Sequence, residues 1–192
     1  TTAALDDGDY SLTVTATDAA GNISAASSAL SITIDATAPG KPSIITTTSL
    51  TNDSTPTIEG IAEAGSTVEL FNGDDSLGTT TADATTGAYS ITTAALDDGD
   101  YSLTVTATDE ADNTSESSDA LSITVDATAP EQPAITTTTT LTNNATPTIA
   151  GTAEADSTVT LLSSGVAIAT TTATGGTFSF TTPTLADSNY VL

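Results

Sequence analysis

The stretch DDGDYSLTVTATDAAGN, residues 6–22, returns almost unchanged as DDGDYSLTVTATDEADN at residues 97–113. Its middle part, 102–108, alternates polar and apolar side chains, which is the pattern of a β-strand with one buried face. Threonine and valine also favour the pleated backbone of a sheet. The sequence therefore predicts a repeated β-strand that carries carboxylates at both of its ends.

The two copies are separated by an offset of 91 residues, counted from Asp6 to Asp97. Three further pairs keep the same offset: Asp35 and Asp126, Pro39 and Pro130, Gly60 and Gly151. A period of this length exceeds the roughly 20–50 residues of a solenoid repeat and suits a small domain. The chain is therefore predicted to be an array of similar domains.

Two proline-containing segments, 34–42 (IDATAPGKP) and 125–133 (VDATAPEQP), interrupt the strand pattern. Closely spaced prolines disfavour helices and central strands, so we expect extended connectors there. We then expect 1–34 to be the C-terminal part of one repeat, 35–126 a complete repeat, and 127–192 the N-terminal part of a third. Because both ends fall inside a repeat, we expect a section of a longer array.

Within the complete repeat, turns rich in glycine, asparagine and aspartate separate seven strand-like segments. Seven short strands in this length are typical of an immunoglobulin-like sandwich. The predicted fold class is therefore all-β, with tandem seven-stranded antiparallel immunoglobulin-like sandwiches. The predicted strands are 43–49, 55–62, 67–72, 77–82, 88–94, 101–108 and 120–126. The residues expected to face the core are Ile58, Val68, Leu70, Leu77, Ile91, Leu103, Val105, Leu121 and Ile123.

Tyr101 follows the turn Leu-Asp-Asp-Gly-Asp, an arrangement typical of the tyrosine corner of these sandwiches. In that corner the tyrosine hydroxyl donates a hydrogen bond to the backbone a few residues upstream. Tyr10 occupies the same position in the preceding repeat, and Tyr190 in the following one. We expect a structural role for these tyrosines.

The composition excludes several classes of function. One lysine, no arginine and no histidine stand against 25 acidic residues, for a net charge of −24, so the chain is not expected to bind nucleic acid. No apolar run is long enough to cross a bilayer, and no membrane insertion is expected. Without histidine or cysteine, the commonest general base and the soft metal ligands are absent. We therefore expect no enzyme.

The absence of cysteine also means that no disulfide can stabilise the small core of each repeat. If the topology is immunoglobulin-like, loops at the upstream end of the complete repeat place Glu63, Asp83 and Asp109 near the connector residue Asp35. Calcium takes 6–8 oxygen ligands, and unpaired clustered carboxylates repel one another. We expect calcium at this junction, with Asp35, Glu63 and Asp109 as the first choice of ligands.

Asp83 is a weaker candidate, because the matching segment 173–175 carries no acid. At the downstream end of the complete repeat, a second group of acids is expected around Asp126. Its other members are Asp97, Asp98 and Asp100. The alternative is that all of these acids are hydrated turn residues, which is common for aspartate.

The segments VDATAP (125–130), GIAEAGSTVELFNG (60–73) and GAYSITTAALDDGDYSLTVTATD (87–109) resemble the bacterial immunoglobulin-like repeats of large secreted adhesins, of the RTX and biofilm-associated type. The resemblance implies a long extender whose linkers are stiffened by calcium. The ligands that it implies are Asp35 and Asp126 in the connectors, Glu63 and Glu154 in the AEA motif, and Asp18 and Asp109 in the TATD motif. Two departures, Gly21 to Asp112 and Gly65 to Asp156, add acids near the same end.

We therefore expect a structural extender on a bacterial cell surface, outside the cell, whose partners are neighbouring repeats of the same or of adjacent chains. The alternative is a segment of an extracellular filament or surface-layer subunit. In that case separate chains would complete each other's sandwiches.

Overall fold

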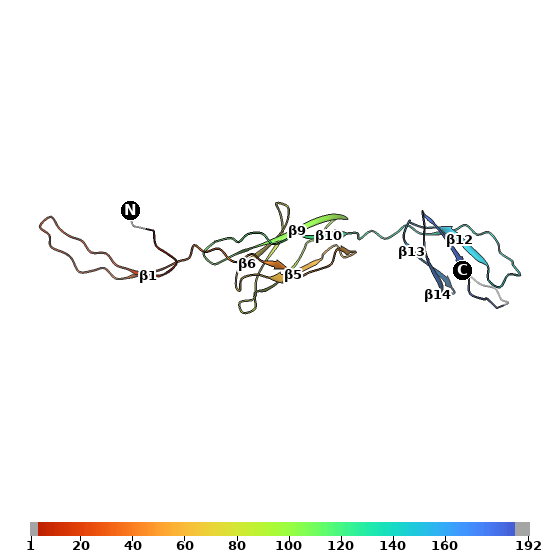
Figure 1. The fold of residues 1–192 in the computed structure, drawn as a ribbon, viewed down its shortest axis with the longest axis horizontal. Helices are drawn as coiled ribbons and strands as arrows, with labels where there is room; N and C mark the ends of the chain where they lie inside the picture. The colour runs from red at the N-terminus through yellow and green to blue at the C-terminus, as the bar shows by residue number, and fades with distance from the viewer. Residues whose placement is uncertain (1–3, 187–192) are drawn as a thin grey trace. The chain divides into compact units, whose positions relative to one another are not determined.

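The computed structural model describes residues 4–186, which form β-strands joined by turns and loops, with no helix in this range (Figure 1). The predicted all-β class is confirmed. The chain divides into two compact units, Thr1–Ala127 and Thr128–Leu192. The assignment of 1–34 and 127–192 to incomplete repeats stays a prediction. Within the described range there is also no helix with the length and apolar character to span a membrane.

The first unit contains a sandwich of two sheets. A three-stranded sheet has the order β3-β5-β8, and a five-stranded sheet has the order β4-β10-β9-β6-β7. Every neighbouring pair is antiparallel except β4 and β10, which are parallel. The strands are β3 (Ser43–Ile44), β4 (Leu50–Thr51), β5 (Thr57–Ile61), β6 (Thr67–Asn72), β7 (Asp75–Thr81), β8 (Ala88–Thr92), β9 (Gly99–Thr108) and β10 (Leu121–Val125).

The first predicted strand, 43–49, is divided between the two sheets. The backbone N–H groups of Ile45 and Thr46 both donate to the carbonyl of Glu59, at 2.9 and 3.4 Å. This shared acceptor ends the pairing of β3 with β5, and the chain then crosses to form β4 beside β10. The sequence pattern did not indicate the crossing, because the threonine-rich run 46–48 has no apolar alternation.

The predicted strand phase is confirmed by the core. Seven of the nine predicted inward residues are buried, and Leu77 and Leu121 pack against them while partly buried. Because side chains alternate along a strand, the intervening threonines and serines face outward. The buried seven are Ile58, Val68, Leu70, Ile91, Leu103, Val105 and Ile123.

An aromatic ring lies over a glycine in the three-stranded sheet. Gly60 is opposite Tyr89 in the β5–β8 register, and a Cβ on Gly60 would come within 2.2 Å of the Tyr89 hydroxyl. That hydroxyl donates to the backbone carbonyl of Ser43 at 2.9 Å, and burial raises the pKa of Tyr89 to about 12. In the second unit Phe178 lies over Gly151 in the same way.

The N-terminal segment forms a hairpin of β1 (Gly8–Leu12) and β2 (Leu30–Ile34). Its register runs from Gly8 opposite Ile34 to Leu12 opposite Leu30. Strands β9 and β10 pair in the same register, 91 residues later. The tyrosine corner is confirmed in both copies, because the hydroxyls of Tyr10 and Tyr101 donate to the carbonyls of Asp6 and Asp97, at 2.8 and 2.9 Å. Tyr190 lies outside the described residues.

The second unit repeats the first part of the sandwich, in sheets of order β11-β12-β15 and β13-β14. Its first four strands begin 91 residues after β3, β5, β6 and β7, but β15 begins 89 residues after β8. The second unit therefore has two residues fewer between β14 and β15 than the first unit has between β7 and β8. The strands are β11 (Ala134–Ile135), β12 (Thr148–Thr152), β13 (Thr158–Ser163), β14 (Val166–Thr172) and β15 (Thr177–Thr181). The core residues are Ile149, Val159, Leu161, Ala173, Phe178 and Phe180.

Replacing Leu103 by alanine should lower the free energy of unfolding of the sandwich by about 2–5 kcal/mol, because a fully buried leucine leaves a cavity. Urea unfolding of the whole chain measures this. Leu12, the equivalent leucine of the hairpin, is partly exposed and provides the matched control. Leu12→Ala in dilute protein should leave the unfolding of the sandwich almost unchanged. A loss below about 1 kcal/mol for Leu103→Ala would contradict the strand phase.

Candidate functional site

The connector that precedes the sandwich is attached to the loop between β9 and β10 by one side chain. The amide Nδ2 of Asn113 donates to the backbone carbonyl of Asp35 at 3.1 Å and to Oδ2 of Asp109 at 2.9 Å. Asp35 and Asp109 were predicted to lie at this junction, and Asn113 was not. A signal was present in the sequence, because an asparagine follows four residues after the aspartate in both copies, at Asn22 and Asn113.

The carboxylate of Asp109 also closes its own loop. Its Oδ1 accepts the backbone N–H groups of Ala111 and Asn113 at 2.9 and 2.8 Å, as aspartates in turns commonly do. The hydrogen bond from the Asn113 side chain, followed by those from the backbone, lowers the pKa of Asp109. Asp109 therefore keeps its charge at a lower pH than an ordinary aspartate.

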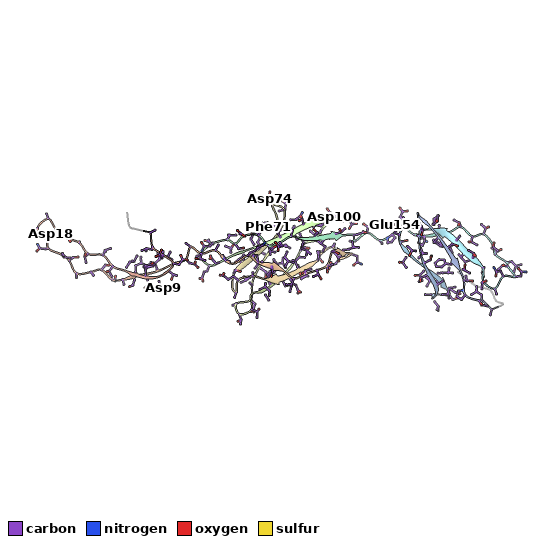
Figure 2. All side chains as sticks on the ribbon, viewed as in Figure 1. Asp9, Asp18, Phe71, Asp74, Asp100 and Glu154 are labelled. Atoms are coloured by element: carbon purple, nitrogen blue, oxygen red, sulfur yellow. The ribbon has the colours of Figure 1, made fainter. Side chains whose placement is uncertain are left out.

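The hairpin contains the same loop. Oδ1 of Asp18 accepts the N–H groups of Ala20 and Asn22, and Oδ2 accepts the Asn22 amide, all between 2.8 and 2.9 Å. These bonds, with that of the Asn22 side chain the strongest contribution, lower the pKa of Asp18. Figure 2 shows Asp18 at the turn of the hairpin and Asp9 on β1, so acids lie at both ends of the repeated stretch.

At two positions a glycine of one repeat is replaced by an aspartate in the next, and all four residues have a positive φ. Asp112 has φ of 67° where Gly21 has 91°, and Asp156 has φ of 65° where Gly65 has 82°. Aspartate tolerates this conformation better than most residues with a side chain. The expected added acids are therefore placed at tight turns, where the backbone conformation fixes them.

The remaining acids at the upstream end serve their own turns. The Asp83 carboxylate accepts the N–H groups of Thr85 and Thr86 and the Thr86 hydroxyl, and these bonds lower its pKa. The carbonyl of Glu63 accepts the N–H and the hydroxyl of Ser66, at 3.1 and 2.8 Å, and so closes the β5–β6 turn.

The acids before β1 and β9 hold the residues that follow β2 and β10. Oδ1 of Asp7 accepts the N–H of Ala36 at 2.9 Å, and Oδ1 of Asp98 accepts the N–H of Ala127 at 2.7 Å. Asp7 also accepts the Thr37 hydroxyl, which is the main cause of its lowered pKa. Carboxylates of both copies thus fix the first residues of the proline connector.

Among the predicted calcium ligands, the structure brings Asp35 and Asp109 together through Asn113. Asp126 belongs to the first unit and Glu154 to the second, and each is placed within its own unit. In residues 4–186, no three acidic side chains gather closely enough to hold a metal ion. The oxygen donors have the chemistry that calcium prefers. A site formed by Asp35, Glu63, Asp109, Asp126, Glu154 or Asp18 therefore stays a prediction.

A shallow groove of about 400 Å³ lies beside the start of β3 and β10. At its rim Nζ of Lys41, the only basic residue of the sequence, lies 2.7 Å from Oδ1 of Asp119. Lys41 lowers the pKa of Asp119 through this hydrogen bond and its charge. Since both side chains are exposed, the pair orients the end of the connector and adds little stability.

Asn113→Ala should raise the pKa of Asp109 toward the usual 3.8, because it removes the largest cause of the lowered value. A lowered pKa stabilises the folded loop above the unfolded pKa, and this stability is lost as the pH falls through the folded pKa. Carboxyl NMR titration measures the pKa of Asp109 in the natural chain and in the variant. In the control, Asn22→Ala should raise the pKa of Asp18 and leave Asp109 unchanged. If Asn113→Ala does not move Asp109, the bridging role of Asn113 is wrong.

Comparison with known proteins places these features in a family. The family model of the bacterial Ig-like domain matches residues 1–36 and 43–127. Among solved structures, the chain is similar to a biofilm associated protein, BSP domain, with 27% identity over 66% of this chain and 20% of that chain and a TM-score of 0.38. It is also similar to fibronectin(III)-like modules of CbhA from Clostridium thermocellum, with 17% identity over 79% of this chain and 78% of that chain and a TM-score of 0.41.

The chain thus spans a fifth of the length of the first of these structures. No curated protein matches. The family match includes the hairpin, the tyrosine corner and the whole sandwich, and it extends over more than half of the sequence. The chain belongs to the family of bacterial Ig-like domains.

Proposed function

We propose that the chain is an extender segment of a bacterial cell-surface adhesin, in which successive repeats hold a distal binding module away from the cell. Three facts support the proposal: the bacterial Ig-like family, the period of 91 residues, and the identical register of β1–β2 and β9–β10. The segment works outside the cell as a mechanical spacer, and the proposal assigns it no catalysis.

The pairing of β4 with β10, the last strand of the repeat, carries the proposal. Leu50 and Thr51 in β4 pair in parallel with Thr124 and Val125 in β10. The N–H of Thr124 donates to the carbonyl of Ser49, and that of Asp126 to the carbonyl of Thr51, both at 2.9 Å. When the two ends of the sandwich are pulled apart, these bonds lie across the direction of pulling and share the force. This geometry resists tension, as an extender requires.

Calcium stiffens the joint in this proposal. The carbonyl of Asp35 and the carboxylate of Asp109 converge on one amide, which supports a shared oxygen site there. Asp35, Glu63 and Asp109 would hold the ion. Asp126 and Glu154, which lie 91 residues after Asp35 and Glu63, would be ligands at the next joint. Asp18, which lies 91 residues before Asp109, would be a ligand at the previous joint. The ion would neutralise repulsion in a chain of net charge −24.

Thr124→Pro should shorten the lifetime of the sandwich under constant pulling force, by up to about tenfold. Proline removes one of the β4–β10 hydrogen bonds, worth about 0.5–1.5 kcal/mol, and 1.4 kcal/mol is about tenfold in rate. Thr33→Pro is the matched control, since Thr33 and Thr124 both donate to an aspartate of the adjacent strand. Single-molecule pulling on the full chain measures the lifetimes. Equal lifetimes for the two variants would contradict the tension-bearing role of β4.

Replacing chelator by calcium should lengthen the full chain in small-angle scattering and raise its melting temperature. The expected dissociation constant is about 10⁻⁴–10⁻³ M, in the range of extracellular modules. Asp35→Asn should respond less, because it keeps the size of the side chain and removes one charge. Asp74→Asn is the control, since Asp74 lies at the tip of the β6–β7 turn (Figure 2). If calcium changes neither the length nor the melting temperature of the natural chain, the stiffening mechanism is wrong. The extender proposal would then be tested by the pulling experiment alone.

A further inference from the structure

The freedom to bend at the first connector is concentrated in residues 35–37. Pro39 and Pro42 have fixed φ angles, and a proline also restricts the residue before it. Both prolines are buried, and Pro42 lines the groove beside β3 and β10. Next to it, Nζ of Lys41 donates to Asp119 of the sandwich at 2.7 Å. Since the later part of the connector is held in this way, a bend between the hairpin and the sandwich requires rotation at 35–37.

The hairpin holds the second half of this short segment with one carboxylate. Oδ1 of Asp7 accepts the N–H of Ala36 at 2.9 Å, and Oδ2 of Asp7 accepts the Thr37 hydroxyl. Backbone pairing between β1 and β2 ends at Gly8 and Ile34. The Asp7 side chain therefore ties the connector to the hairpin beyond the last backbone pair.

The sandwich holds the first half of the same segment. Nδ2 of Asn113 donates to the carbonyl of Asp35 at 3.1 Å and to Oδ2 of Asp109 at 2.9 Å. The backbone N–H of Asn113 also donates to Oδ1 of Asp109, at 2.8 Å. The amide that binds Asp35 is therefore positioned by its own loop in the sandwich.

The two sets of hydrogen bonds cross along the chain. Asp35, which directly follows the hairpin, is bound by the sandwich, whereas Ala36 and Thr37, which come later, are bound by the hairpin. A bend before Asp35 separates Ala36 from Asp7. A bend after Thr37 separates Asp35 from Asn113. A change of direction in this segment therefore breaks at least one of the two connections.

We propose that these crossed hydrogen bonds hold the hairpin and the sandwich in one preferred arrangement without a metal ion. We call them the latch: Asp7 with Ala36 and Thr37, and Asn113 with Asp35. The latch assigns the direction of the next repeat to the protein's own hydrogen bonds, which goes beyond the role of a spacer. It is independent of calcium and of the adhesin assignment.

The parts of the latch recur with the period of the repeat. Oδ1 of Asp98 accepts the N–H of Ala127 at 2.7 Å, 91 residues after the first copy of this bond. In the hairpin Nδ2 of Asn22 donates to Oδ2 of Asp18, as in the equivalent loop of the sandwich. This recurrence is expected of a device that joins each repeat to the next.

The latch sets a direction and leaves room for calcium to act on it. Its hydrogen bonds are exposed to water, so each adds only a modest stability. Loss of one such bond should raise the population of the open latch about two- to tenfold. Bound calcium would reduce this opening, and the closed arrangement would stay the same.

Hydrogen exchange of two backbone amides tests the connection made by the hairpin. Asp7→Ala should accelerate exchange at Ala36 about two- to tenfold, because exchange proceeds from the open state. It should leave exchange at Ala127 unchanged. Asp98→Ala is the matched control and should have the opposite pattern. NMR of the full chain in chelator measures both amides. If Asp7→Ala leaves exchange at Ala36 unchanged, the proposed latch is wrong.

Distances between the hairpin and the sandwich test the arrangement itself. The natural chain has no cysteine, so Ser31→Cys and Thr79→Cys give two unique label sites, at exposed positions of β2 and β7. In chelator, double electron–electron resonance of the nitroxide-labelled chain should show one main distance. Asn113→Ala should broaden the distribution. Asn22→Ala is the matched control and should leave it unchanged, because Asn22 lies in the loop of the hairpin.

A second variant and calcium complete this test. Asp7→Ala should broaden the distribution as Asn113→Ala does, although it leaves the loop of the sandwich intact. Calcium should narrow the distribution of the natural chain around the same main distance. If calcium has no effect while both variants broaden the distribution, the latch is supported and calcium stiffening is wrong. If the natural chain is as broadly distributed as both variants, or if calcium moves the main distance to a new value, the latch is wrong.

Discussion

The pairing of β9 with β6 is the interaction on which the sandwich depends. It places Leu70 directly beside Val105 in one sheet, and both belong with Val68 and Leu103 to the buried cluster. The chain has no cysteine and few aromatic residues, so no disulfide adds to this packing. A small β-sandwich with so limited a core gains its stability from closing the two sheets over one another. Among the described residues β1 pairs with β2, and Leu12 and Val14, the equivalents of Leu103 and Val105, are exposed.

The carboxylates have a different role from the core. Asp18, Asp83 and Asp109 each accept several hydrogen bonds from their own loops, and each has a lowered pKa. Hydrogen bonds within the protein therefore order each of these loops. A calcium ion at the joint would add to the connection between Asp35 and the 109–113 loop, which the side-chain amide of Asn113 makes in the protein itself.

The strand phase and the tyrosine corner could be predicted from sequence, because both follow from local spacing. Alternation placed Leu103 and Ile123 inside, and the turn before Tyr101 fixed its hydrogen bond to Asp97. The crossing of the first strand from one sheet to the other could not be predicted from sequence, because it depends on the Glu59 carbonyl that Ile45 and Thr46 share. Asn113 was missed for a similar reason: its partner Asp35 is 78 residues away, and only the folded chain brings them together. Strand order determines at which end of the sandwich each acidic loop lies. It does not determine whether the carboxylates of different loops come within reach of one ion.

The unchanged stretch GDYSLTVTATD, in identical register in two repeats, also has a consequence for synthesis. Because two hairpins share this stretch and this register, they can compete for the same packing partner, and misassembly between neighbouring units is a characteristic failure of repeat proteins. The order of the chain limits the error. The strands from β3 to β8 leave the ribosome before β9 and β10. The hairpin that emerges next is therefore the first one available to complete the sandwich. In refolding from denaturant all hairpins compete at once, and the array loses the protection that vectorial synthesis gives it.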